Sequence, residues 1–306
     1  MNTLAIDIGG TKFSVALFEG ARGDIRRGDM RMTRRESRAT DRDGGPAWVL
    51  AQVESIVQEW KRDAAMERCG IGFGGPVDFS RQRVALSTHV EGWRDFDLPK
   101  RIAGMVNAPV VMDNDANLGA LGEARYGAGR DARPLFYMTL STGIGGGLIL
   151  ENGEVYRGAD FYAGEIGHLT VQPGGPECLC GSHGCLERMC AGLWLERDHG
   201  MPARQLLGDP VFVARYVQPL ALGLKAAIML LNPARVVIGG GIAKAGDALF
   251  VPLRQELGRH MPAWSRARLD VVPAALGDDS VLWGAPALVE PSGRSSPSTV
   301  CPTPFS

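Results

Sequence analysis

The chain has 306 residues with a formal net charge of −1, and 45% of them are hydrophobic. This length accommodates one large or two medium domains, and the balanced charge gives no reason to expect nucleic acid or a membrane surface as a partner. No run of apolar residues approaches bilayer length and no signal-like segment opens the chain, while three of the six cysteines form one tight cluster. We therefore expect a protein of the reducing cytoplasm.

A glycine turn between two short apolar strands opens the chain. Residues 3–8 and 13–18 read as the strands, and Asp7 lies near the end of the first. The turn is formed by Gly9, Gly10, Thr11 and Lys12. Consecutive backbone amides in such a turn can cradle a phosphate, and Asp7 can supply a carboxylate to a magnesium shell. A plain β-hairpin with a polar turn is the alternative that this segment leaves open.

Arginines and acids are interleaved in the next segment, from residue 24 to residue 43. This mixture predicts a solvated edge strand and loop rather than a patch that binds nucleic acid. Residues 47–61 then carry apolar side chains at helical spacing, which predicts a helix that covers one face of a sheet.

Two further apolar strands end in turns that carry glycine or polar residues. The first covers residues 69–73 and runs into a sharp turn that contains Gly75. The second covers residues 110–112 and is followed by three polar residues, which include Asn114 and Asp115, and then by a helix. Open α/β sheets hold their ligands at such strand ends. Capping of the helix is the alternative role, although three polar residues in a row exceed what a cap needs.

A second unit of strand, glycine turn and strand covers residues 135–150. Its turn contains Thr142 and Gly143, and we expect its second strand over residues 148–150. Two hairpins with a Gly/Thr tip, one in each half of the chain, predict a duplicated architecture that holds a phosphate chain between two lobes.

The last third of the chain alternates between helical and strand patterns. The predicted elements are a helix over 210–231, a strand over 235–238, a helix from about Lys244, a strand over 269–272 and a helix over 281–289. Gly240 and Gly241 leave room for a flat ring such as adenine against the backbone, and tight packing is the alternative. Pro, Ser and Thr dominate residues 291–306, which predicts a disordered tail.

A histidine and a cysteine cluster have the composition of a zinc site. The candidate ligands are His168, Cys178, Cys180 and Cys185. Three thiolates and one imidazole suit a closed, tetrahedral structural zinc. His183 lies inside the same loop and is an alternative nitrogen ligand, whereas a disulfide within the Cys-x-Cys pair would be strained.

Two glutamates lie just outside these ligands. Glu165 precedes the candidate ligand His168 by three residues, and Glu187 follows Cys185 by two. A loop folded around the ion would hold both carboxylates at its ends. A small hydroxylated ligand could then bind between them.

Five motifs in this order resemble those of the ROK family, the repressor, ORF and kinase group of bacterial sugar kinases. The motifs are Asp7 to Lys12, Asn114 to Asn117, Ser141 to Gly147, Glu165 to His168, and Cys178 to Cys180 with Gly184 to Glu187. The resemblance extends from about residue 3 to residue 290. It implies an α/β protein with the actin-like, ribonuclease-H-like ATPase fold, in which two lobes surround a cleft and a zinc loop has a structural role.

The resemblance also implies where the lobes lie. Residues 1–112 would form a small N-terminal lobe, completed by the last helix at about 278–290. Residues 113–277 would form a large lobe that carries the zinc loop and the helices of a homodimer or homotetramer contact.

Roles are carried over from the family position by position. Asp115 matches the catalytic base that removes the proton from the sugar hydroxyl. The residues that match sugar contacts are Gly75, Asn114, Asp115, Glu165, His168 and Glu187. The residues that match nucleotide contacts are Asp7, Gly9, Gly10, Thr11, Lys12, Thr142, Gly143, Gly240 and Gly241. The implied cofactors are ATP, Mg²⁺ held through Asp7, and the structural Zn²⁺.

The resemblance implies phosphorylation of a hexose at its 6-hydroxyl, with glucose as the first candidate. Ser87-Thr88 is similar to N-acylmannosamine kinases, and a fructokinase is a further alternative. Repressors of the family carry a winged helix-turn-helix before the first strand, which begins here by Thr3, so we expect no DNA-binding module and do not favour a sugar-sensing regulator.

Overall fold

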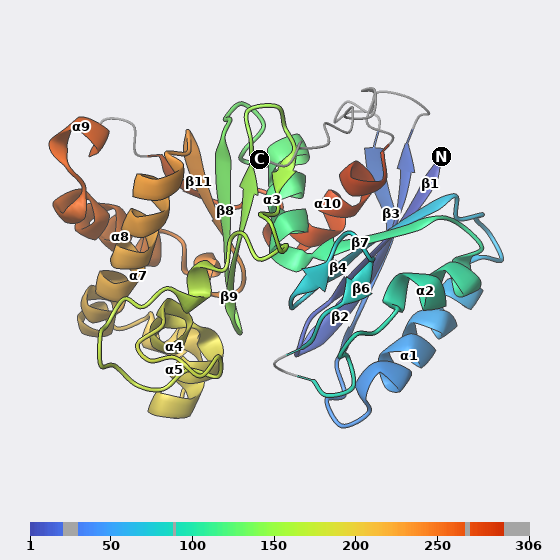
Figure 1. The fold of residues 1–306 in the computed structure, drawn as a ribbon, viewed down its shortest axis with the longest axis horizontal. Helices are drawn as coiled ribbons and strands as arrows, with labels where there is room; N and C mark the ends of the chain where they lie inside the picture. The colour runs from blue at the N-terminus through green and yellow to red at the C-terminus, as the bar shows by residue number, and fades with distance from the viewer. Residues whose placement is uncertain (21–29, 88–89, 267–269, 291–306) are drawn as a thin grey trace, which may run out of the picture.

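Two five-stranded sheets stand side by side in the computed structural model, which describes residues 1–20, 30–87, 90–266 and 270–290 (Figure 1). The first sheet contains β1 (Asn2–Ile8), β2 (Lys12–Gly20), β3 (Met30–Ala39), β4 (Arg68–Phe73) and β7 (Val110–Asn114). The second contains β8 (Leu135–Leu140), β9 (Ile144–Ile149), β10 (Val155–Tyr156), β11 (Arg235–Gly239) and β12 (Val271–Pro273). A small hairpin is formed by β5 (Val77–Asp78) and β6 (Arg83–Val84).

The two large sheets have the same connectivity. Their strand orders are β3-β2-β1-β4-β7 and β10-β9-β8-β11-β12. In each, the first three strands pair antiparallel and the remaining pairings are parallel. This repetition agrees with the duplication that the two glycine hairpins predict. The glycine turns β1–β2 and β8–β9 therefore occupy equivalent positions in the two sheets.

The first sheet has a covered face and a polar edge, as its sequence predicts. Helices α1 (Gly45–Trp60) and α2 (Leu98–Val106) contribute to one core with β1, β2 and β4, into which α1 buries Val49, Val53 and Ile56. The arginine-rich strand β3 lies at the edge, where exposed residues alternate with less exposed ones. The arginines at positions 26 and 27 of this segment lie outside the described residues.

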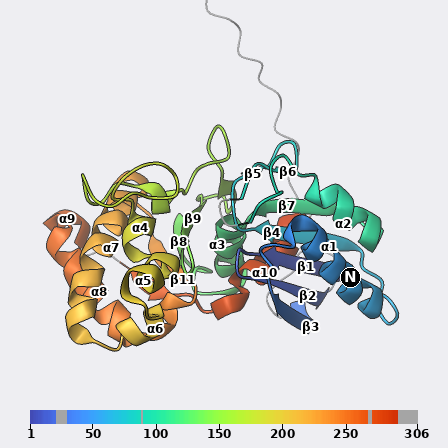
Figure 2. The ribbon, with the colours of Figure 1, turned by 90° about the horizontal axis from the view of Figure 1, so that it is seen from below.

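Helices α3 (Asp115–Tyr126) and α10 (Ser280–Val289) lie between the two sheets (Figure 2). They cross closely because each has a glycine at the contact. A Cβ atom at Gly122 would meet the carbonyl oxygen of Ser280, and one at Gly284 would meet that of Leu118. The C-terminal helix also packs against β1 and β4. Helix α10, which comes late in the chain, therefore packs on the N-terminal sheet.

The outer side of the second sheet is covered by helices. These are α4 (Leu186–Cys190), α5 (Gly192–His199), α6 (Ala203–Leu206), α7 (Pro210–Leu231), α8 (Asp247–His260) and α9 (Ala263–Arg266). The largest core cluster lies between the sheet and α7 and α8. Helix α7 has the bounds that its apolar periodicity predicts.

Several predicted boundaries differ from the structure, as the following cases show. Strand β9 begins at Ile144 rather than at residue 148, because the glycines at 145–147 join the ladder with β8. The helix expected from Lys244 begins at Asp247, after a 3₁₀ turn over Ile242–Ala245 and Gly246, which has a positive φ. The last strand begins at Val271, and residue 269 lies outside the described part of the chain, as do residues 291–306.

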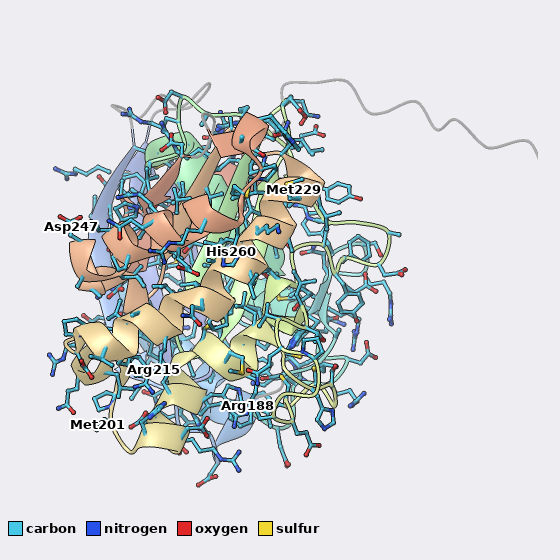
Figure 3. The ribbon with its side chains drawn as sticks, turned by 90° about the vertical axis from the view of Figure 1, so that its left-hand side faces the viewer. Arg188, Met201, Arg215, Met229, Asp247 and His260 are labelled. Carbon is cyan, nitrogen blue, oxygen red and sulfur yellow. The ribbon has the colours of Figure 1, made fainter. Side chains whose placement is uncertain are left out.

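Helix α7 combines a buried face with an apolar outer face. Val211, Leu222 and Met229 are 65%, 37% and 42% exposed. Figure 3 shows Met229 together with Arg215 on the outer side of the molecule. By length and composition alone α7 meets the criterion for a membrane span, contrary to the expectation of no bilayer-length apolar segment, and half of its most apolar window is buried. Core helices of globular proteins meet the same criterion.

Candidate active site

A cavity of about 500 Å³ lies between the two sheets. It is lined by the β1–β2 and β8–β9 turns, the ends of β4, β7 and β11, the segment that carries Glu165 and His168, and the beginning of α10. Every residue to which the family resemblance assigns a sugar or nucleotide contact lines this one cavity. The structure thus brings together residues that are up to 234 positions apart, from Asp7 to Gly241. Their individual roles stay predictions.

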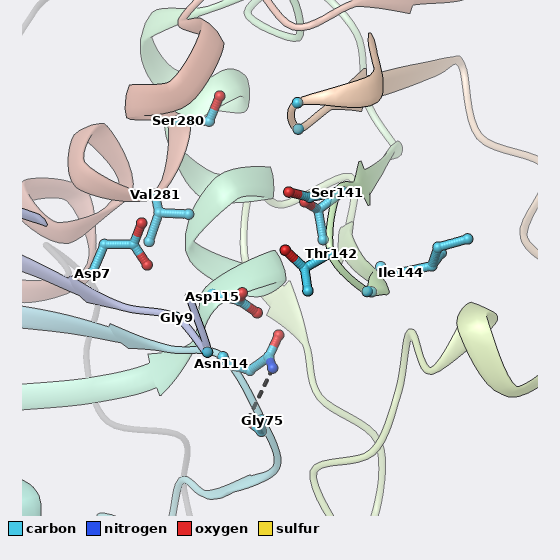
Figure 4. Close-up of a pocket in the computed structure, with 18 of the residues that line it drawn as sticks. Asp7, Gly9, Gly75, Asn114, Asp115, Ser141, Thr142, Ile144, Ser280 and Val281 are labelled. Carbon is cyan, nitrogen blue, oxygen red and sulfur yellow. Dashed lines mark hydrogen bonds between the residues drawn. The ribbon is translucent and has the colours of Figure 1, made fainter. Parts of the chain in front are cut away.

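Asn114 and Asp115 lie where β7 passes into α3 (Figure 4). The side-chain oxygen of Asn114 accepts a hydrogen bond from the backbone N–H of Ala116 at 2.9 Å and caps the helix. Its amide nitrogen donates to the carbonyl oxygen of Gly75 at 3.0 Å. Asn114 therefore caps α3, which is the alternative role that the sequence leaves open for this junction. The same side chain also bonds to the turn after β4. Asp115 lines the cavity, and its Oδ1 atom accepts a hydrogen bond from the backbone N–H of Ala116 at 2.8 Å.

Asp115 has the electrostatics of a proton acceptor at neutral pH. Burial raises the pKa of its carboxyl to about 7; the backbone N–H of Ala116 opposes this rise and the charge of Glu165 adds to it. Burial and the nearby Asp115 likewise raise the pKa of Asp7 to about 7, while Lys12 lowers it. A carboxylate whose pKa lies near the working pH is suited to general base catalysis.

The buried carboxylate of Asp113 forms an ion pair with the partly exposed Arg157 behind this junction. Asp113 Oδ2 accepts from Arg157 Nε at 2.9 Å and lies 2.7 Å from its Nη2. The other oxygen, Oδ1, accepts from Asn117 Nδ2 at 3.0 Å. Arg157 follows β10 in the second sheet and its guanidinium lies 3.7 Å from the ring centroid of Phe79. The sequence analysis did not identify this link between the sheets. The available signal was Asp113, the first of three consecutive polar residues where β7 passes into α3.

The four candidate zinc ligands lie together. Their donor atoms are all within 4.8 Å of one another, with 3.7 Å between Cys180 Sγ and Cys185 Sγ and 3.9 Å between Cys178 Sγ and His168 Nδ1. Thiolates about 2.3 Å from a tetrahedral zinc stand about 3.8 Å apart, so the donor set and its spacing fit that ion. All four thiols of this region, that of Cys190 included, are free of disulfides.

His183 does not belong to this cluster. Its backbone pairs with Glu177, and its carbonyl oxygen accepts from Thr170 Oγ1 at 3.4 Å. The nitrogen donor of the cluster is that of His168.

The cluster positions two carboxylates at the cavity. His168 turns Nδ1 toward Cys178 and Nε2 toward Glu165, whose Oε2 lies 3.9 Å away. Burial raises the pKa of Glu165, and His168 opposes the rise. Glu187 accepts a hydrogen bond from the backbone N–H of Ile144 at 2.9 Å, which links the first turn of α4 to β9. Both acids and the histidine line the cavity.

The two glycine turns face each other across the cavity. Each is closed by a backbone hydrogen bond of 3.0 Å, from Gly9 N to the oxygen of Lys12 and from Ser141 N to that of Gly143. Figure 4 shows Gly9 and Asp7 across the cavity from Ser141 and Thr142. Gly240 has a φ of +88° and lies against the carbonyl of Leu140, so no side chain fits there. Such turns present backbone amides to a phosphate or a flat ring.

Glu123 on α3 is a fully buried acid that sequence reasoning missed. Its carboxylate accepts four hydrogen bonds, from the backbone N–H groups of Ala128, Ala275 and Leu276 at 2.7, 3.1 and 2.9 Å and from Ser280 Oγ at 2.8 Å. It thereby fixes the segment that leads into α10. This segment forms part of the cavity wall.

Replacement of Glu123 by alanine should leave these buried donors without a partner. We expect the free energy of unfolding to fall by about 3 kcal/mol or more, because each unsatisfied buried donor costs about 1–3 kcal/mol. Urea unfolding followed by circular dichroism measures this. Glu54→Ala, at an exposed position of α1, is the matched control and should change the value by less than about 0.5 kcal/mol. Equal effects of the two variants would contradict the assignment.

Two sheets of one connectivity, with a glycine hairpin from each facing a shared cavity, define the actin-like class of α/β ATPase folds. The profile of the ROK family matches residues 3–292. The chain belongs to the ROK family, as its five motifs predict.

Several known proteins are similar over nearly the whole chain. The glucokinase of Thermotoga maritima is 30% identical to this chain in an alignment that covers 95% of this chain and 98% of that protein. The structure of a ROK family glucokinase from Streptomyces griseus in complex with glucose and AMPPNP aligns with a TM-score of 0.80 at 30% identity, over 94% of this chain and 99% of that one. The ROK hexokinase of Thermus thermophilus aligns with a TM-score of 0.73 at 32% identity, over 93% and 96%.

Proposed function

We propose that the protein is a glucokinase that transfers the terminal phosphoryl group of ATP to the 6-hydroxyl of glucose. The observation that carries this proposal is the single cavity that joins Asp115, the two glycine turns and the acids next to the cysteine cluster. Full-length similarity to glucokinases at about 30% identity, including one with glucose and AMPPNP bound, supports it.

In the proposed reaction Asp115 accepts the proton of the 6-hydroxyl as that oxygen attacks the phosphorus atom. Glu165, Glu187 and His168 accept or donate hydrogen bonds to the remaining hydroxyls, and Asn114 holds the turn at Gly75 beside the sugar. The amides of the two glycine turns orient the phosphate chain for in-line transfer. Carboxylates suit the sugar because each oxygen accepts bonds from neighbouring hydroxyls.

Two ions complete this proposal. Zn²⁺ bound by His168, Cys178, Cys180 and Cys185 would have a structural role. It would fix the orientation of the histidine ring through one of its nitrogen atoms. Mg²⁺ held near Asp7 supplies neutralisation of the phosphate charge when it is bound.

The remaining elements of the proposal concern the assembly. The small lobe consists of residues 1–112 with the helix at about 278–290, and the large lobe of residues 113–277. The apolar outer face of α7 supports a homodimer or homotetramer, because exposed apolar patches of this kind commonly mark subunit contacts. We place the enzyme in the cytoplasm, with a small-molecule hexose as its partner.

A panel of sugars tests the substrate. We expect ADP release, measured by a coupled assay, to be fastest with glucose among glucose, mannose, fructose, N-acetylglucosamine and N-acetylmannosamine. Faster turnover of N-acetylmannosamine or fructose would move the assignment to an N-acylmannosamine kinase or a fructokinase. Turnover of none of them would count against a kinase.

The pKa of Asp115 predicts an acid limb in the pH profile. A raised pKa means that the carboxyl is protonated below about pH 7, and a protonated carboxyl cannot accept the hydroxyl proton. We therefore expect kcat/KM for glucose, measured at saturating MgATP, to fall about tenfold for each pH unit below that value. A profile that stays flat down to about pH 5 would contradict the assignment of the base.

A further inference from the structure

Two lysines from opposite sides of the cavity approach the same carboxylate oxygen. Lys12, in the β1–β2 turn of the first sheet, places its Nζ atom 3.8 Å from Asp278 Oδ2. Lys244, which follows the end of β11 in the second sheet, places its Nζ atom 2.6 Å from that oxygen. Asp278 belongs to the short turn before α10, and all three residues line the cavity.

These ion pairs are exposed, so their contribution to folding is small. The side chains of Lys12 and Lys244 are 48% and 60% accessible, and that of Asp278 is 33% accessible. Solvent-exposed ion pairs contribute at most about 1 kcal/mol to stability. Partial burial raises the pKa of Asp278, but Lys244 and Lys12 outweigh this effect and hold it below its usual value. The carboxylate is therefore ionised at neutral pH.

The position of the Asp278 carboxylate matters more than the small free energy that its ion pairs contribute to folding. Lys12 belongs to the hairpin to which the proposed function assigns phosphate contacts, and Lys244 lies three residues beyond Gly241. A triphosphate that enters between the two hairpins brings several anionic oxygens to the same two ammonium groups. Lysine forms charge-assisted bonds to phosphate as well as to carboxylate, and a triphosphate carries more negative charge than one carboxylate, so a nucleotide can compete with Asp278 for both lysines.

We propose that Lys244 is a second phosphate-binding cation beside Lys12, and that Asp278 holds both lysines in the free enzyme at the place that a phosphate oxygen of ATP takes. This inference rests on the proposed function and extends it to two residues that the family motifs do not include. Asp278 is then a positioning residue that also selects against ligands with too little negative charge to displace it.

The proposal predicts opposite effects of the two variants on nucleotide binding. Lys244→Met should weaken binding of the ATP analogue AMPPNP about three- to tenfold, because one charged contact to phosphate is lost. Asp278→Asn should tighten it by a similar factor, because the competing carboxylate is removed. Neither variant should change the affinity for adenosine, which carries no phosphate.

Isothermal titration calorimetry with Mg²⁺ and either AMPPNP or adenosine measures these affinities without turnover. Lys100→Met removes an exposed lysine of α2, and Asp63→Asn removes an exposed carboxylate outside the cavity, which pairs with Arg34 at 2.7 Å. Both controls should leave AMPPNP binding within about twofold, since their charges are screened or paired elsewhere. The double variant Lys244→Met with Asp278→Asn should bind AMPPNP more weakly than Asp278→Asn alone.

Each outcome is decisive. Weaker AMPPNP binding by Asp278→Asn, or equal changes for adenosine and AMPPNP, would overturn the inference. A double variant that binds as tightly as Asp278→Asn would show that Lys244 only neutralises Asp278. A wild-type protein that binds neither ligand would instead overturn the proposed kinase function.

Discussion

Replacement of Asp115 by asparagine should reduce turnover about 10²–10⁴-fold, the range that a positioned general base contributes. The amide has nearly the same shape but no useful basicity, so the 6-hydroxyl keeps its neighbour and loses its proton acceptor. The dissociation constant for glucose should stay within about threefold, because one acceptor oxygen remains.

Two measurements separate chemistry from binding in this variant. ADP release gives kcat, and titration of the intrinsic tryptophan fluorescence with glucose gives the dissociation constant. Glu151→Gln, at an exposed position between β9 and β10, is the matched carboxylate-to-amide control and should keep full activity. Near-normal turnover of Asp115→Asn would mean that another group accepts the proton.

Replacement of Cys185 by alanine should remove the zinc and, with it, the sugar site. The Sγ atom of Cys185 lies 3.7 Å from that of Cys180. Cys185 directly precedes α4, whose first turn carries Glu187. A zinc site with three ligands is open, and structural zinc contributes directly to folding of the loop that binds it. We expect kcat/KM for glucose to fall at least about 10²-fold.

Cys190→Ala provides the matched control. Its thiol is equally buried and lies five residues further along the chain, outside the metal cluster. This variant should retain one zinc per chain by elemental analysis and bind glucose normally. Glucose binding by a zinc-free Cys185→Ala protein would show that the two glutamates do not depend on the ion for their positions.

Local patterns were sufficient to predict most strands of the two large sheets and the long helices, whereas the fold class was implied by the resemblance to the ROK family. The 22-residue helix α7 follows from an uninterrupted helical period, and the duplicated hairpins follow from two similar glycine turns. The cavity residues and the cysteine cluster are recognisable because each motif is short and continuous in sequence. The predicted boundaries were wrong where a glycine allows either of two structures. The glycines at 145–147 continue strand β9, whereas Gly246 precedes helix α8, which begins only at Asp247.

The residues that sequence reasoning missed act through long-range contacts. Glu123 bonds to backbone groups about 150 positions away, at Ala275 and Leu276, and no periodicity within α3 marks it. The carboxylate of Asp278 lies close to the ammonium group of Lys12, although Lys12 is near the beginning of the chain and Asp278 is in its last tenth. Such partners become visible only when the last helix is placed beside the first sheet. Burial then raises the pKa of Asp115, which the sequence alone cannot reveal either.

A crystal structure of the enzyme with glucose and AMPPNP is the most direct test of the central claim that the cysteine cluster holds two glutamates opposite Asp115 around a sugar. We predict a zinc ion among His168 and the three thiols, and a 6-hydroxyl within about 3 Å of an Asp115 oxygen. The other hydroxyls should contact Glu165, Glu187 and His168. A sugar bound elsewhere, or one whose 6-hydroxyl points away from Asp115, would contradict the account.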